Sequence, residues 1–138
     1  MAQTVRDVMT ADPIKLPASE RITTAAKAMR DSDVGDVLVT DDDQHLVGIV
    51  TDRDIVVRAV ADGSADTATL DAVCSEPVWL APDRPVEEAI DLMRERAIRR
   101  LPVVDQDVVI GIVSLGDLAV ERDPKSALGE ISAARPTT

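Results

Sequence analysis

The sequence predicts a mixed α/β fold built from two similar β-α-β-β-α repeats. The segment Gly48–Asp54 recurs as Gly111–Asp117, with glycine, isoleucine, valine, a hydroxyl residue and a later aspartate in the same places. Matching positions continue on both sides of this segment, at an offset that falls from 65 to 63 residues. Strand-like and helix-like apolar spacings also alternate in the same order in each copy. Because each copy alone would have a marginal core, we expect the two copies to pack on each other.

Each copy is predicted to begin with a short helical turn and a brief strand. Residues 5–9 and 70–74 carry apolar side chains at helical spacing. Residues 14–16 and 78–80 alternate apolar with other side chains over a short run, which is typical of a strand.

An amphipathic helix and a hairpin follow in each copy. Apolar residues fall at helical spacing over 22–29 and 86–93, which predicts in each copy a helix with one apolar face buried in the core. Two apolar runs separated by an acidic turn predict the hairpins, at 37–39 with 46–50 and at 101–104 with 109–113.

A second helix closes each copy, and a polar linker separates the copies. Helical spacing returns at 55–60 and at 118–119, and Gly63 is expected to end the first of these helices. Residues 62–69 are small and polar. We therefore divide the chain into a first repeat at 1–64, a second repeat at 65–122, and a C-terminal tail at 123–138 with a weak helical segment at 127–133.

The charge balance excludes some classes of partner. With 15 Lys and Arg against 26 Asp and Glu, the net charge of the 138 residues is −11, which repels nucleic acids and anionic membranes. No long apolar segment and no secretory signal pattern occurs, so we expect a cytoplasmic protein without membrane insertion.

Residue types that carry metal or catalytic chemistry are sparse. Cys74 has no partner for an internal disulfide, and a small buried hydrophobe is the favoured interpretation. His45 has no second His or Cys at ligand spacing. The acidic turn 41–43 could hold Mg²⁺ or Ca²⁺ weakly, but a solvated hairpin turn explains it more simply. We therefore predict no metal site and, in the absence of a nucleophile-base pair or P-loop pattern, no enzyme activity.

The repeated hydroxyl-x-x-aspartate pairs have two interpretations. Thr51 with Asp54, and Ser114 with Asp117, stand where a strand passes into a helix, and this spacing is typical of a helix cap. Alternatively, the hydroxyl and the helix N-terminus face a phosphate, while the carboxylate accepts two hydrogen bonds from a ribose diol. Two copies after an identical Gly-Ile-Val favour the second interpretation.

These motifs, together with Val8-Met9-Thr10 and Leu101-Pro102-Val103-Val104-Asp105, resemble a tandem pair of cystathionine-β-synthase (CBS) domains of the small stand-alone bacterial type. The resemblance covers residues 5 to about 121. It implies repeats packed sheet to sheet with pseudo-twofold symmetry, and two clefts for an adenosine-containing regulatory ligand: AMP, ADP, ATP or S-adenosylmethionine. It further implies no required cofactor, a homodimer and an unknown effector protein. The alternative is a structural scaffold without a nucleotide ligand.

The resemblance also assigns residues to each cleft, and it predicts that the clefts are unequal. Asp36 stands where the second copy has Arg100 and would repel a phosphate, so we expect the cleft at Asp117 to be the better phosphate binder. Arg53 could partly compensate in the other cleft. The second-copy cleft would use Asp117, Ser114, Ile112, Arg99, Arg100, Thr10, Ile14 and Val34, and the first-copy cleft Asp54, Thr51, Ile49, Arg53, Ser75, Val78 and Ile98.

Overall fold

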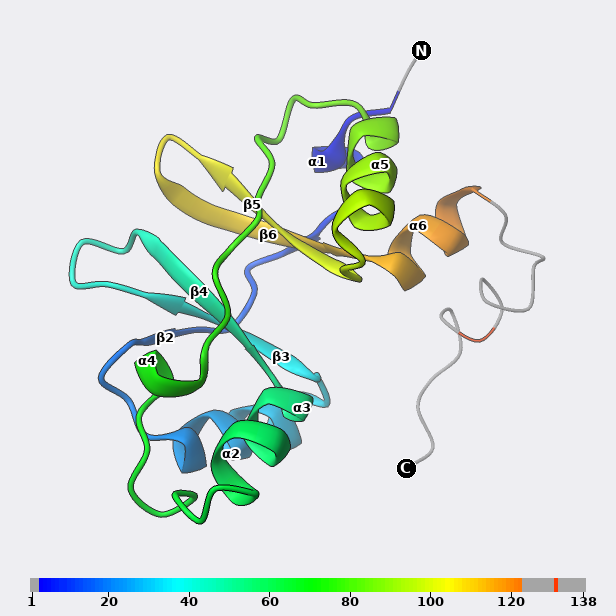
Figure 1. The fold of residues 1–138 in the computed structure, drawn as a ribbon. Coiled ribbons are helices and arrows are strands. Elements are labelled where there is room, and N and C mark those ends of the chain that lie inside the picture. The colour runs from blue at the N-terminus through cyan, green and yellow to red at the C-terminus, as the bar shows by residue number, and fades with distance from the viewer. Residues whose placement is uncertain (1–2, 123–130, 132–138) are drawn as a thin grey trace. The chain divides into compact units, whose positions relative to one another are not determined.

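The structure is a computed structural model that describes residues 3–122 and residue 131. It confirms the mixed α/β fold, with two three-stranded sheets and helices packed against them (Figure 1). The described chain forms two compact units. Among the described residues, unit 1 comprises 3–12, 78–106, 110–122 and residue 131, and unit 2 comprises Pro13–Pro77 and Asp107–Val109. The helical segment predicted at 127–133 lies outside the described residues, apart from residue 131.

Unit 2 is a sheet in the order β2-β3-β4 with helices against it. Strand β2 runs parallel to β3, and β3 runs antiparallel to β4. Val37, Val39 and Val50 of the sheet pack in one core with Ile22 and the other buried helix residues. The elements are β2 (Lys15–Pro17), α2 (Ile22–Ser32), β3 (Asp36–Thr40), β4 (Leu46–Thr51), α3 (Asp52–Asp54), the π-helix η1 (Ile55–Val60) and α4 (Leu70–Val73).

Unit 1 has a sheet in the order β1-β6-β5, and β1 pairs antiparallel to β6. Val103 and Val113 of this sheet pack with Val86 and Met93 of a helix in a second core. The two strands β5 and β6 are joined at Gln106 and Asp107, whose φ values of 51° and 69° fit a two-residue hairpin turn. The elements are α1 (Val5–Val8), β1 (Thr10–Ala11), α5 (Val86–Arg96), β5 (Arg100–Asp105), β6 (Val108–Ser114) and α6 (Leu115–Arg122).

The opening segment of each sequence repeat lies in the unit built mainly from the other repeat. Val5 donates from its backbone N–H to Arg84 O at 2.8 Å, and Leu70 donates in the same way to Glu20 O at 2.9 Å. Both apolar side chains are fully buried in the core that they join. The compact units and the sequence repeats at 1–64 and 65–122 therefore divide the chain differently.

One of the two predicted opening strands is nearly lost, and a proline explains why. In unit 2, Leu38 donates its backbone N–H to Ile14 O at 2.9 Å, which helps to dock β2. Pro102 occupies the matching position in unit 1 and has no N–H to donate. The strand predicted at 78–80 is accordingly reduced to a single bridge between Leu80 and Val103.

The helix predicted at 55–60 differs from expectation in its hydrogen bonding. It forms the π-helix η1, in which each backbone hydrogen bond spans five residues instead of the four of an α-helix. The Ala61 N–H continues this pattern by donating to Val56 O at 3.0 Å. Gly63 follows with φ of 75°, as its predicted role at the end of the helix requires. Across the described part of the chain, no helix has the length and apolar character needed to span a bilayer.

Candidate ligand-binding sites

Both hydroxyl-aspartate pairs form reciprocal helix caps. The Thr51 N–H donates to Asp54 Oδ2 at 2.9 Å, and the Asp54 N–H donates back to Thr51 Oγ1 at 3.1 Å. Ser114 and Asp117 repeat this geometry, with both distances at 3.0 Å. The capping interpretation is therefore confirmed for both pairs. The cap uses Oδ2 of each carboxylate, so any further hydrogen bond or ion pair of each aspartate depends on Oδ1 and its surroundings.

The second carboxylate oxygen has different surroundings in the two copies. Asp54 Oδ1 lies 3.9 Å from Arg58 Nε, and the Asp54 side chain is 15% exposed. Arg58 also donates from Nη1 to the carbonyl oxygens of Val73, at 3.3 Å, and Cys74, at 3.5 Å. The residue four positions after Asp117 is Glu121, which brings no cation. A diol that approached Asp54 would therefore compete with a guanidinium, whereas the sequence has no arginine at the matching position after Asp117.

Each unit brings a second hydroxyl residue beside its cap. Thr10 pairs with Ile112 in unit 1, two residues before Ser114. In unit 2, Ser75 pairs with Ile49, and their backbones exchange hydrogen bonds at 3.0 and 3.2 Å. The structure thus assembles Thr10, Ile112, Ser114 and Asp117 in unit 1, and Ser75, Ile49, Thr51 and Asp54 in unit 2.

The repeated glycine explains how these segments approach so closely. A Cβ at Gly48 would lie 2.9 Å from Ser75 O, and a Cβ at Gly111 would lie 3.0 Å from Thr10 O. Only glycine leaves room for the crossing backbone at this distance. This role of the two glycines was not predicted, although the repetition of Gly-Ile-Val in both copies carried the signal.

The predicted arginines are partly positioned by backbone contacts. Arg99 is exposed, and its carbonyl oxygen accepts a hydrogen bond from the Leu115 N–H at 2.8 Å, which holds it beside the start of α6. Arg100 begins β5 and is half-buried, whereas Arg53 is exposed. Four other residues predicted for the clefts do not share a unit with the aspartate of their cleft. Ile14 and Val34, predicted to act with Asp117, belong to unit 2. Val78 and Ile98, predicted to act with Asp54, belong to unit 1.

Cys74 packs against the core of unit 2 and has an altered acidity. Burial is the main cause that raises the pKa of its thiol above the ordinary value, and the nearby Asp71 carboxylate adds to the effect. Sγ also contacts the position that a Cβ of Gly48 would occupy. The thiol is therefore less nucleophilic near neutral pH than a solvated cysteine.

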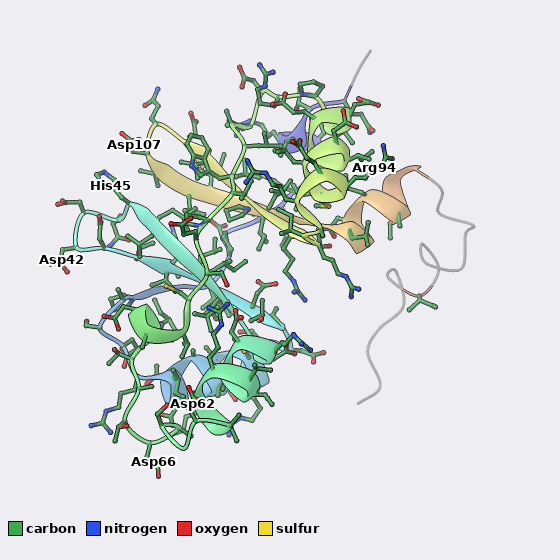
Figure 2. All side chains as sticks on the ribbon, in the orientation of Figure 1. Asp42, His45, Asp62, Asp66, Arg94 and Asp107 are labelled. Carbon is green, nitrogen blue, oxygen red and sulfur yellow. The ribbon has the colours of Figure 1, made fainter. Side chains whose placement is uncertain are left out.

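The acidic hairpin between β3 and β4 gathers three groups with metal-ligand chemistry. Ligand atoms of Asp41, Asp43 and His45 lie within 4.8 Å of one another. Asp41 Oδ1 accepts hydrogen bonds from the backbone N–H groups of Asp43 and His45, each at 2.9 Å. These bonds shape a turn, and Figure 2 shows Asp42 and His45 at its tip.

Comparison with known proteins identifies relatives along most of the chain. The CBS domain family model matches residues 5–60 and 70–122. The uncharacterised protein YlbB of Bacillus subtilis (strain 168) is 38% identical over 134 residues, which cover 93% of this chain and 90% of YlbB.

Solved structures agree with the sequence match. The CBS domain pair of protein MJ0100, in complex with 5-methylthioadenosine and S-adenosyl-L-methionine, superposes with a TM-score of 0.82 at 26% identity, covering 91% of this chain and 100% of that chain. Hypoxic Response Protein I, crystallised with two coordinated zinc ions, gives a TM-score of 0.79 at 34% identity, covering 85% and 97%. The two matched repeats and this fold show that the chain belongs to the CBS-domain family.

Proposed function

We propose that this chain is a cytoplasmic regulatory module that binds an adenosine-containing ligand and passes the bound state to a partner protein. The ligand classes are AMP, ADP, ATP and S-adenosylmethionine. The better site is the one at Ser114 and Asp117, with Thr10 and Ile112 beside it. The module works as a homodimer.

The observation that carries this proposal is the twice-repeated arrangement of two hydroxyls and an aspartate with one oxygen outside its cap. Asp117 uses Oδ2 in the cap, and Oδ1 takes no part in it. That oxygen suits a ribose hydroxyl, while Ser114 and the N-terminus of α6 suit a phosphate or carboxylate. The complex of the related MJ0100 pair with two adenosyl compounds supports this ligand class.

Ligand binding without catalysis fits the groups around Asp117. In the described residues, the groups placed with it are Thr10, Ile112 and Ser114, which include neither a general base nor a nucleophile activated by one. Such a site can hold a ligand, and regulation follows if the ligand binds two states of the protein with different affinity.

The experiment is ligand titration by calorimetry, preceded by a thermal-shift screen of adenine nucleotides, guanine nucleotides and S-adenosylmethionine. A ligand that binds the native state raises the melting temperature. Asp117→Asn keeps an oxygen that can accept the cap hydrogen bond but removes the carboxylate charge, so we expect normal folding and at least tenfold weaker binding. Asp83→Asn, at an exposed turn, is the matched control and should bind like wild type.

The confirmed caps favour one second candidate, a scaffold without a nucleotide ligand. In a scaffold, Asp54 and Asp117 would serve only the helices that they cap. A screen in which no adenosyl compound shifts the melting temperature at millimolar concentration would favour that function and overturn the sensor.

A further inference from the structure

Arg58 of η1 is positioned by contacts with three oxygen atoms of unit 2. Its Nη1 donates to Val73 O at 3.3 Å and to Cys74 O at 3.5 Å, and its Nε lies 3.9 Å from Asp54 Oδ1. Both carbonyl groups belong to the C-terminal end of α4, which packs beside η1. A guanidinium fixed in this way has already lost much of the side-chain freedom that binding an anion would cost.

Part of this guanidinium remains available for another partner. Among the described residues, the contacts of Arg58 use Nε and Nη1 and leave Nη2 without a hydrogen bond. The Arg58 side chain is 49% exposed, so solvent and ligands reach it. Arginine presents its N–H groups as a planar fork that matches the oxygens of a phosphate. Arg58 therefore has the donors and the access that binding a phosphate requires.

The position of Arg58 determines which part of a bound nucleoside it could reach. Asp54 uses Oδ2 in the helix cap, so Oδ1 is the oxygen that a ribose hydroxyl would take. Because Arg58 Nε lies beside this same oxygen, the guanidinium would stand next to the 2′ and 3′ oxygens of the ribose. In dinucleotide-binding proteins, an acidic residue accepts the free ribose hydroxyl, whereas a nearby arginine accommodates a phosphate in its place.

The local charge permits such a phosphate, although unit 2 as a whole is acidic. Residues 51–60 contain two arginines and two aspartates, so their net charge is zero. The Asp54 carboxylate alone would repel a phosphate, but the Arg58 guanidinium beside it offsets that charge. The matching residue of the second copy is Glu121, so this cation is confined to the first copy.

We propose that the Asp54 site selects an adenosine ligand with a phosphate on its ribose 2′ or 3′ oxygen, and that Arg58 binds this phosphate. The remaining ribose hydroxyl donates to Asp54 Oδ1. The inference rests on the proposed function, because it needs a ribose at Asp54, and it adds a ligand class for the weaker of the two sites. One chain would then recognise a free diol at Asp117 and a ribose phosphate at Asp54.

The test is calorimetric titration of the full chain in an Asp117→Asn background, which weakens the other site. The probes are adenosine, its 2′- and 3′-monophosphates, and its 5′-monophosphate, which has a similar charge placed away from the ribose diol. We expect the 2′ or the 3′ isomer to bind at least about fivefold more tightly than adenosine. Inorganic phosphate should not displace that isomer at equal concentration. Equally tight binding of inorganic phosphate would overturn recognition of a ribose phosphate.

Substitution of Arg58 tests whether this residue causes the preference. Arg58→Gln should weaken binding of the preferred isomer at least about fivefold. Adenosine and its 5′-monophosphate should bind no more weakly than before, a combination that misfolding cannot produce. Arg58→Lys keeps the charge without the planar fork and should retain part of the preference. Lys27→Gln, which removes an exposed cation from α2 of the same unit, is the matched control and should keep the full preference.

The outcomes separate this inference from the proposed function. If adenosine binds but neither ribose-phosphate isomer binds more tightly, the inference is wrong and the sensor stands. A preference that persists in Arg58→Gln, or an equal loss of adenosine and of the isomer, would overturn the assignment of the phosphate to Arg58. If none of the adenosine compounds binds the wild-type chain, both the inference and the proposed function are wrong.

Discussion

At the scale of single residues, each of the two aspartates uses one carboxylate oxygen in a helix cap, and the proposed ligand would take the other. Oδ2 of each carboxylate caps a helix, with nearly the same distances in both copies. The spacing of hydroxyl and acid predicted this cap. The spacing did not reveal that Arg58 reaches Asp54, because the ion pair depends on how η1 turns the side chain. The predicted inequality between the sites would therefore have a second cause besides repulsion by Asp36.

The Arg58 contact predicts a gain in binding at the weaker site. In an Asp117→Asn background, Arg58→Gln should strengthen adenosine binding up to about fivefold, because an exposed ion pair of about 1 kcal/mol or less no longer competes for Asp54. Calorimetry with adenosine, which has no phosphate, measures this effect directly. Lys27→Gln, at an exposed position of α2, is the control and should leave adenosine affinity unchanged. Weaker binding in Arg58→Gln would show that the arginine positions Asp54 for the ligand instead.

Cys74 predicts a pH dependence at the same scale. Its raised pKa means that the folded protein holds the thiol proton at pH values where the unfolded chain has lost it. The resulting contribution to stability is fully present below the ordinary thiol pKa, and it is lost as pH rises through the raised value. Alkylation by iodoacetamide should be slower in the folded protein than in urea near pH 8.5. Equal rates would contradict the burial of the thiol.

At the scale of elements, one proline accounts for the main difference between the sheets. Leu38 donates a ladder hydrogen bond that Pro102 cannot donate, so unit 2 has the opening strand β2, whereas unit 1 keeps only the bridge between Leu80 and Val103. Apolar periodicity predicted both strands equally, because periodicity describes burial and not the supply of N–H donors. The β1–β6 pairing also escaped prediction, since Thr10 and Ile112 are distant in the sequence and their contact depends on the whole fold. The long helices were predictable because their apolar spacing is local.

This explanation predicts the effect of moving the proline. Leu38→Pro removes the bond to Ile14 O and leaves a smaller side chain at a fully buried position, so unfolding should require about 2–4 kcal/mol less free energy. Urea denaturation followed by circular dichroism measures the loss. Leu38→Met, which keeps the volume and the N–H, should cost less than about 1.5 kcal/mol. Equal stability of the two variants would show that the N–H is unimportant to β2.

At the scale of the whole molecule, the negative charge is concentrated in one unit. Unit 2 contains 14 Asp and Glu against six Lys and Arg, which gives −8 of the total −11. Ion pairs offset little of this repulsion, because those recorded among residues 3–122 are mostly at the surface, such as Arg30 with Asp31. The fold therefore depends on its two apolar cores, and the surface charge of unit 2 works against its compactness.

Screening this charge should stabilise the protein. Raising NaCl from about 20 to about 300 mM shortens the Debye length from roughly 20 Å to under 10 Å, so the melting temperature should rise by several degrees. Scanning at low protein concentration keeps self-association from contributing. Asp62→Lys with Asp66→Lys, two exposed positions of unit 2 (Figure 2), should raise the melting temperature at low salt and reduce its salt dependence. A melting temperature that falls with salt would mean that attractive surface pairs outweigh the repulsion within unit 2.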